Sequence, residues 1–139
     1  RRARLTAAEF RWEIVRPRFL ASGRKPPWDQ FNPNDWFDPS KQTISCHFPM
    51  ETKEFDGKPF RGALLDYDDL RVRYESGPEF RHWCLWNHDP SDGFLCPEPM
   101  SWLVNAPNLP LPPEETGFQT IAPHGSWNGI NRISVEELQ

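Results

Sequence analysis

The chain has 139 residues, the length of one domain with a substantial hydrophobic core, and it shows neither an internal repeat nor a domain boundary. Its formal net charge of -4 and the lack of a dense basic stretch argue against a nucleic-acid-binding protein. No apolar run approaches the ~20 residues that cross a bilayer, and no signal-peptide core follows the N-terminus, so we expect a cytoplasmic protein without membrane contact.

In chain order, the first predicted elements are two strands separated by a long loop. Apolar and polar residues alternate over residues 9–15 and again over residues 42–48, which is the period of a half-buried strand. Residues 17–40 carry five prolines and two Asx-Pro steps, which mark turns. Loops of this length without internal structure are often functional.

The rest of the chain also reads as short strands joined by turns. Residues 89–93, Asp-Pro-Ser-Asp-Gly, predict a hairpin turn, and the apolar run before it has the two-sided pattern of a central strand. Strands are expected at residues 63–65, 70–74, 79–87, 93–98, 117–123 and 131–138. Roughly six to eight short strands without a helix predict an all-β protein, an antiparallel β-sandwich in preference to a small closed barrel.

The three cysteines, Cys46, Cys84 and Cys96, each lie in an apolar, strand-like run. Because an odd number does not form a disulfide framework, we interpret them as buried free thiols in a reducing compartment. No Cys-x-x-Cys or His-x-x-x-His spacing occurs, and the eight glycines are scattered. We therefore expect neither a metal nor a nucleotide cofactor.

Glu98 is the first candidate for a catalytic residue. The apolar run over residues 94–96 reads as a buried strand that ends at Glu98, and Pro97 and Pro99 flank this carboxylate. A carboxylate desolvated at such a position suits a general acid or base that works near neutral pH. The alternative is that Glu98 accepts backbone hydrogen bonds and closes a turn, as in a purely structural or partner-binding domain.

The seven tryptophans supply candidate platforms for a sugar ring. Trp102 is the nearest of them to Glu98 in sequence, Trp36 lies in the long loop, and Trp86 lies near the predicted hairpin. Core packing is the alternative role for each of these rings.

Two segments around Glu98 resemble the C-terminal section of the aldose 1-epimerase (galactose mutarotase) family. In that family a strand into Cys-x-Glu-Pro and an Asn-Ala-x-Asn step precede a Gly-hydrophobic stretch and a Pro-Gly turn into the last strand. The matching positions here are Cys96-Pro97-Glu98-Pro99, Asn105-Ala106-Pro107-Asn108, Gly117-Phe118 and Pro123-His124-Gly125. The resemblance implies a β-sandwich of the galactose-mutarotase (super-sandwich) type, with residues 1–139 as one domain that forms its C-terminal portion.

The resemblance also implies a role for Glu98. The matching glutamate takes the proton from the anomeric hydroxyl of a sugar, a hexose or a related carbohydrate, while a histidine protonates the ring oxygen, so that the ring opens and closes to the other anomer. The family's histidine-bearing segment has no match here, and none of His47, His82, His88 and His124 has its context. The chain is then an isomerase completed by an N-terminal half or a second copy, or else a non-catalytic carbohydrate-binding module.

A second carboxylate of the family binds a sugar hydroxyl from an Asp-x-x-aromatic context. The best match is Asp56, with Phe60 as the aromatic residue one position later than usual, and Asp66 and Asp68 are alternatives. Asp-rich turns before a strand are generally solvated, which is the competing reading for all three. The resemblance thus implies a sugar site formed by Glu98 and Asp56 together with the tryptophans named above.

Overall fold

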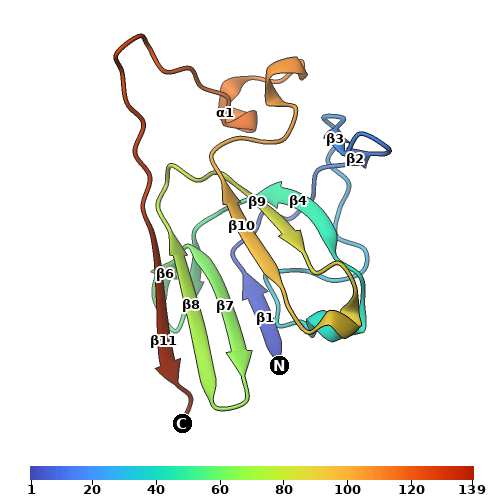
Figure 1. Cartoon of the computed structure of the whole chain (residues 1–139), viewed down its shortest axis with the longest axis vertical. Helices are drawn as coiled ribbons and strands as arrows, with labels where there is room; N and C mark the ends of the chain where they lie inside the picture. Colours follow the sequence, from blue (N-terminus) through green and yellow to red (C-terminus); the bar gives the residue numbers. More distant parts are fainter.

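The computed structural model describes all residues 1–139 and consists almost entirely of antiparallel strands (Figure 1). The larger sheet has the order β1-β7-β8-β11, with β1 (Arg2–Leu5), β7 (Gly62–Tyr67), β8 (Leu70–Ser76) and β11 (Asn131–Glu137). The smaller sheet has the order β10-β9-β4, with β10 (Cys96–Met100), β9 (His82–Trp86) and β4 (Ser45–Pro49).

Two hairpins and a few short helices complete the fold. The hairpins pair β2 (Ile14–Val15) with β3 (Leu20–Ala21) and β5 (Lys53–Phe55) with β6 (Lys58–Phe60). The helices are η1 (Pro39–Lys41), η2 (Pro90–Asp92), η3 (Ala106–Asn108) and α1 (Pro113–Thr116). None of them has the length and hydropathy to cross a membrane.

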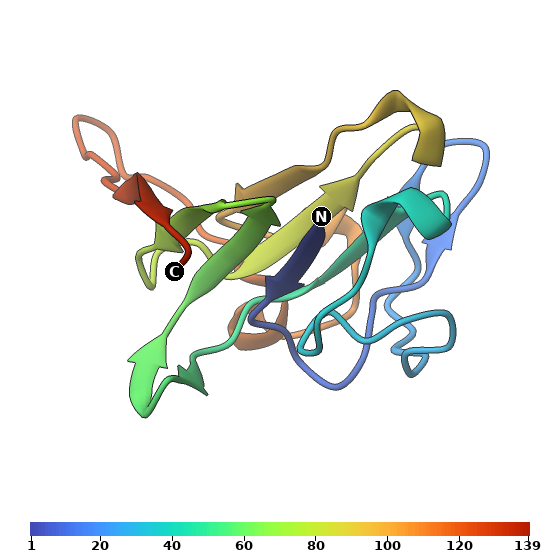
Figure 2. The ribbon, with the colours of Figure 1, turned by 90° about the horizontal axis from the view of Figure 1, so that it is seen from below.

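The two larger sheets form two layers that enclose the main core (Figure 2). Alternate residues of each strand point inward, because side chains along a strand project to opposite faces. Leu5 and Leu65 of the larger sheet meet Phe48, Trp83 and Leu85 of the smaller one, and all five are buried. Burial of one such side chain contributes about 1.5–3 kcal/mol, so this contact holds the layers together. The predicted all-β antiparallel sandwich is confirmed.

The hairpin between β9 and β10 forms as its sequence predicts. β9 lies between two neighbours and is apolar on the inner face, as a central strand requires. Asp89 caps η2 by accepting a hydrogen bond from the backbone N–H of Ser91 at 2.8 Å. Gly93 then adopts a φ of 75°, in the left-handed region that favours glycine, and the chain turns into β10.

The predicted strand over residues 9–15 is reduced to β2 and isolated bridges. Trp12 pairs with His47 and Phe10 pairs with Pro27 as single bridges. The neighbouring segment on that side contains two consecutive prolines, Pro26-Pro27, which have no N–H to donate. A continuous ladder therefore does not form there.

The expected strand at residues 117–123 is absent, and a strand at the N-terminus is present instead. Residues 117–123 have no strand beside them, and a strand needs the backbone groups of a neighbour. β1 is missing from the sequence-based prediction because its four residues give too short an alternation. It becomes a strand because β7 offers it an antiparallel partner over its full length.

A second apolar cluster covers one end of the outer face of the smaller sheet. Residues 101–118 fold back after β10, where Figure 1 shows them in orange above the sheet. Leu103 and Ala106 from this segment pack with Trp12 and Ala21. On the remainder of the outer face, Glu98 is exposed and its neighbours Cys84 and His47 are half-buried.

Candidate functional site

Glu98 lies in the middle of β10 and belongs to a row of side chains that crosses the smaller sheet. The register places Glu98 opposite Cys84 of β9, and Cys84 opposite His47 of β4. Residues directly opposite each other project from the same face of a sheet. The isolated bridge between Trp12 and His47 extends this row by one more side chain.

The row points away from the core. Its neighbours along β9 and β4, such as Trp83 and Phe48, are fully buried on the opposite face. On the outer face the row is flanked on one side by Trp86, which is 38% exposed, and on the other by His82, which is 1% exposed. The Trp86 side of the row is therefore open, and the His82 side is covered.

The expectation of a desolvated glutamate at the end of a buried strand is wrong for this chain. Glu98 is exposed and makes no hydrogen bond or ion pair. The reason is that β10 is an edge strand of the smaller sheet, with β9 on one side only. Pro97 and Pro99 fit this position, because alternate N–H groups of an edge strand point to solvent and their loss is tolerated there.

His82 is a buried, fully partnered histidine. Its Nδ1 accepts a hydrogen bond from Trp12 Nε1 at 3.3 Å. Burial lowers the pKa of His82 to about 4, assisted by the nearby charge of Arg81 and opposed by hydrogen bonds to the backbone of Thr116 and Glu115. The ring is therefore neutral at pH 7, and its role is to join the sheet to residues 101–118.

His47 differs from His82 in having no hydrogen-bond partner. Its Nδ1 is buried without a polar partner, although the residue as a whole is only half-buried. Burial lowers the pKa of His47 below its usual value. An unsatisfied buried nitrogen costs stability, so such a group calls for an explanation beyond packing.

All three cysteines are free, as predicted, but they are half-buried instead of fully buried. Burial raises the pKa of Cys84 to about 11, with a further contribution from the charge of Glu98. Burial raises the pKa of Cys46 to about 12, and burial and Glu98 raise the pKa of Cys96. The thiols are thus protonated at neutral pH and are poor nucleophiles. No three His, Cys, Asp or Glu side chains lie close enough together to hold a metal ion.

Two of the predicted tryptophans lie in or next to the smaller sheet, Trp86 on β9 and Trp102 shortly after β10. Trp86 projects from the same face as Glu98, opposite Cys96, and its ring packs against Phe94 with 5.5 Å between centroids. Trp102 follows the end of β10 and stacks on Phe118, with centroids 5.0 Å apart and planes inclined by 14°. Both rings keep part of their surface exposed.

Asp56 and Trp36 lie on the opposite side of the sandwich from Glu98. Asp56 is exposed in the turn between β5 and β6, with a φ of 49°. The ring of Trp36 lies beneath the guanidinium of Arg2, 4.1 Å from its centroid, on the outer face of the larger sheet. The structure therefore does not bring these two residues together with Glu98.

The two alternatives to Asp56 differ in their surroundings, since Asp66 is buried and Asp68 is exposed. Asp66 is 5% exposed, and its carboxylate accepts hydrogen bonds from Arg2 Nε at 2.8 Å and Arg71 Nε at 2.7 Å. Burial by itself raises the pKa of Asp66, but the two guanidinium groups outweigh it and lower the pKa below its usual value. Asp68 has a φ of 48° in the turn between β7 and β8.

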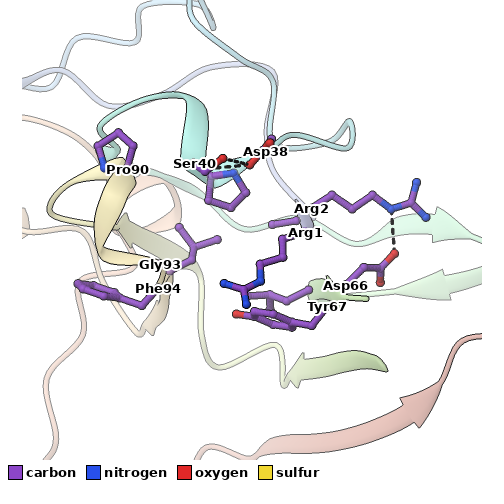
Figure 3. A pocket seen from close by; sticks show the side chains of 13 residues that line it. Arg1, Arg2, Asp38, Ser40, Asp66, Tyr67, Pro90, Gly93 and Phe94 are labelled. Atoms are coloured by element: carbon purple, nitrogen blue, oxygen red, sulfur yellow. Dashed lines mark hydrogen bonds and ion pairs between the residues drawn. The ribbon is translucent and has the colours of Figure 1, made fainter. Parts of the chain in front are cut away.

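A separate hollow lies between the two sheets at the end near the N-terminus (Figure 3). It has a volume of about 440 Å³, including space open to solvent. Leu65 and Leu95 contribute apolar surface, and the guanidinium of Arg1 reaches over Tyr67, 5.8 Å from the ring centroid. Neither Glu98 nor any of the predicted tryptophans lines this hollow.

The fold has a close counterpart among solved structures. A galactose mutarotase-like protein from Clostridium acetobutylicum superposes with a TM-score of 0.85 over 99% of this chain, at 24% sequence identity. The chain has a galactose mutarotase-like fold. It spans 41% of the length of that structure. No family model matches the chain.

The mutarotase-like fold confirms the architecture that the motifs around Glu98 imply, but the sequence alone did not point to His47 or Cys84. His47 lies in a predicted strand, yet nothing in the sequence says which strand pairs with which. The alternation of residues 42–48 could have assigned His47 to the polar face of that strand. Only the pairing of β4, β9 and β10 places it in line with Glu98.

Proposed function

We propose that this mutarotase-like chain belongs to an aldose 1-epimerase-like protein that interconverts the anomers of a sugar, with Glu98 as the general base. The observation that carries the proposal is the place of Glu98: an unpartnered carboxylate on the open face of a mutarotase-like sandwich, within Cys-x-Glu-Pro. Its exposure leaves it accessible to an anomeric hydroxyl, and no cation of the chain competes for it.

His47 is the residue of this chain best placed to act with Glu98 on the ring oxygen. Neighbouring strands are about 4.8 Å apart, so the backbones at these two positions, two strands apart, are separated by roughly 10 Å. Only the small side chain of Cys84 stands between them. The lowered pKa of His47 leaves its ring neutral at neutral pH, so we propose that it donates a hydrogen bond to the ring oxygen while Glu98 takes the anomeric proton.

Trp86 and, at the end of β10, Trp102 are the proposed stacking surfaces for the sugar, because an exposed aromatic ring offers an apolar face to the C–H groups of a pyranose. We leave Asp56 and Trp36 out of this site, since they lie on the other side of the sandwich. Acid–base chemistry of this kind uses only protonation and deprotonation of the sugar oxygens, so we propose an isomerase of carbohydrate metabolism without a cofactor.

Residues 1–139 are proposed to form one domain that corresponds to the C-terminal part of such an epimerase. The mutarotase-like structure that it matches is more than twice as long, which leaves room for a complementary part that supplies further site residues. Three free thiols support a cytoplasmic location.

Polarimetry tests the enzyme proposal directly. Freshly dissolved α-D-galactose and α-D-glucose should equilibrate faster with the protein than in buffer, and Glu98→Gln should slow the catalysed rate by about 100-fold or more. Glu54→Gln is the matched control, because Glu54 is also an exposed strand glutamate but lies on β5. If the wild-type chain and its complex with any complementary part give no rate above buffer, the chain is not a mutarotase.

A non-catalytic carbohydrate-binding module is the second candidate. The exposed rings of Trp86 and Trp102 favour it, because they can bind a sugar whether or not a proton is moved. Sugar-dependent quenching of tryptophan fluorescence that is lost in Trp86→Ala but kept in Glu98→Gln, without any catalysed mutarotation, would support this module. Failure of both measurements would leave a structural domain in which the β10 segment only completes the sheet.

A further inference from the structure

The outer edge of β11 is an uncovered sheet edge. All seven residues of the strand are exposed, and β8 is its only neighbour (Figure 1). The other edge of the same sheet is covered, since Ala3 of β1 exchanges two backbone hydrogen bonds with Phe37. Long uncovered edges are avoided in soluble proteins because their free N–H and C=O groups bind other strands.

The backbone of β11 shows which groups are free. The N–H of Gly77 donates to the carbonyl of Ile130, and the N–H of Leu138 donates to the carbonyl of Asp69. In an antiparallel ladder alternate residues face the partner, so the even-numbered residues of β11 face β8. The odd-numbered residues 131, 133, 135 and 137 therefore direct their N–H and C=O groups outward.

We infer that β11 pairs with β11 of a second copy of this chain across a two-fold axis at Ser134. Ser134 is the middle residue of the strand, so this antiparallel register pairs all seven residues. It sets odd-numbered residues opposite odd-numbered residues, and these carry the free backbone groups. Ile133 meets Val135 of the other copy, and the two sheets join into one continuous eight-stranded sheet.

The side chains of β11 are complementary to themselves in this register. Arg132 comes to lie opposite Glu136 of the other copy, twice because of the symmetry. Ile133 and Val135, which are 65% and 62% exposed in the single chain, lose surface to each other on the other face. Closed two-fold pairing uses the same strand on both sides and leaves no further edge, which stops growth at the dimer.

The register within the chain extends the same pattern. On β8, Glu75 lies opposite Arg132, and Arg71 lies opposite Glu136, at 3.8 Å between Nη1 and Oε1. Each row of the joined sheet then alternates in charge from β8 through both copies of β11 to β8 of the second copy. A strand of unrelated sequence would not match these charges twice, which favours a second copy over another partner. The inference is independent of the sugar chemistry proposed above.

Light scattering after size exclusion tests the dimer. The chain should show a concentration-dependent mass that rises from 16.3 kDa toward twice that value. Val135→Pro should abolish the increase, because it removes an outward N–H without touching the ladder to β8. Val135→Thr, which keeps the N–H, should still dimerise. A monomer at every concentration up to about 1 mM, where even weak pairs associate, would overturn the inference.

Charge exchange tests the register and does not depend on the proline variant folding. Arg132→Glu and Glu136→Arg should each weaken self-association by about tenfold or more, because like charges then face each other twice. An equimolar mixture of the two variants should restore the dimer, since every facing pair is again of opposite charge. A dimer that survives both single variants, or a mixture that stays monomeric, would contradict the proposed axis at Ser134.

Discussion

Each outer face of the sandwich carries a row of polar side chains across three strands, and the two rows differ in whether their charges have partners. On the larger sheet Asp66 lies between Arg2 and Arg71, with both carboxylate oxygens bonded. Burial of that carboxylate is possible because two guanidinium groups replace the water it loses. This row joins β1, β7 and β8 and is a structural element.

On the smaller sheet the corresponding row is Glu98, Cys84 and His47, and it contains no hydrogen bond. Glu98 remains hydrated, whereas His47 has a buried nitrogen without a partner. The exposed carboxylate of Glu98 contributes little to stability and remains available to a ligand, whereas the buried, unpartnered nitrogen of His47 reduces stability. The row that stabilises the fold and the row proposed to bind a sugar therefore lie on opposite faces of the sandwich.

The largest effect should follow from breaking the partnered row. Asp66→Asn leaves two guanidinium groups without their carboxylate, and breaking a mostly buried charge pair costs about 3 kcal/mol of unfolding free energy. Urea denaturation at pH 7 measures this loss. Glu98→Gln is the control from the unpartnered row and should change the same free energy by less than about 0.5 kcal/mol.

The difference in unfolding free energy between wild type and Asp66→Asn should depend on pH. Because the pKa of Asp66 is lower in the folded chain than in the unfolded chain, its stabilisation is complete above the unfolded pKa of about 3.9. It is lost as the pH falls through the lower, folded pKa. The gap between wild type and Asp66→Asn should thus be constant above about pH 5 and narrow below about pH 4. A constant gap down to pH 2 would contradict this account.

The covered end of the smaller sheet should respond to acid at a higher pH. The pKa of His82 falls from about 6.5 in the unfolded chain to about 4 in the folded chain, so the unfolded chain binds more protons between these values. Stability is therefore complete above pH 6.5 and is lost as the pH falls toward 4. We expect a loss of about 2 kcal/mol between pH 7 and pH 5 in urea denaturation.

Burial also lowers the pKa of His47, in the same direction as that of His82. A variant is therefore needed to assign the acid response to one of the two histidines. His82→Gln should have a lower unfolding free energy than wild type at pH 7. Its unfolding free energy should, however, change little between pH 7 and pH 5. If the variant keeps the full pH dependence, His47 and not His82 is its source.

The smallest expected change in unfolding free energy has the opposite sign and comes from the unpartnered row. His47→Leu removes a buried nitrogen that lacks a partner and should increase the unfolding free energy by about 0.5–1 kcal/mol. The same substitution should abolish catalysed mutarotation, if the wild-type chain shows it. A loss of more than 1 kcal/mol would mean that the imidazole makes a stabilising contact, and His47 would then belong with the structural residues.

Part of the fold and of the candidate site followed from local sequence. The turn at residues 89–93 and the two-sided apolar pattern before it were sufficient for the β9–β10 hairpin, because both signals lie within one short stretch. The motifs around Glu98 implied the mutarotase-type sandwich in the same way. Trp86 could be placed near Glu98 for the same reason, since the hairpin brings neighbours in sequence together.

What required the tertiary structure is every relation between segments far apart in the chain. The alternation along a strand tells which of its side chains lie on the same face. Which strands pair with each other is decided by the packing of the whole sandwich. The sequence alone determined an all-β chain with Glu98 as its candidate base. Only the tertiary structure decided that Glu98 is exposed, that His47 faces it across Cys84, and that Asp56 and Trp36 lie on the far side.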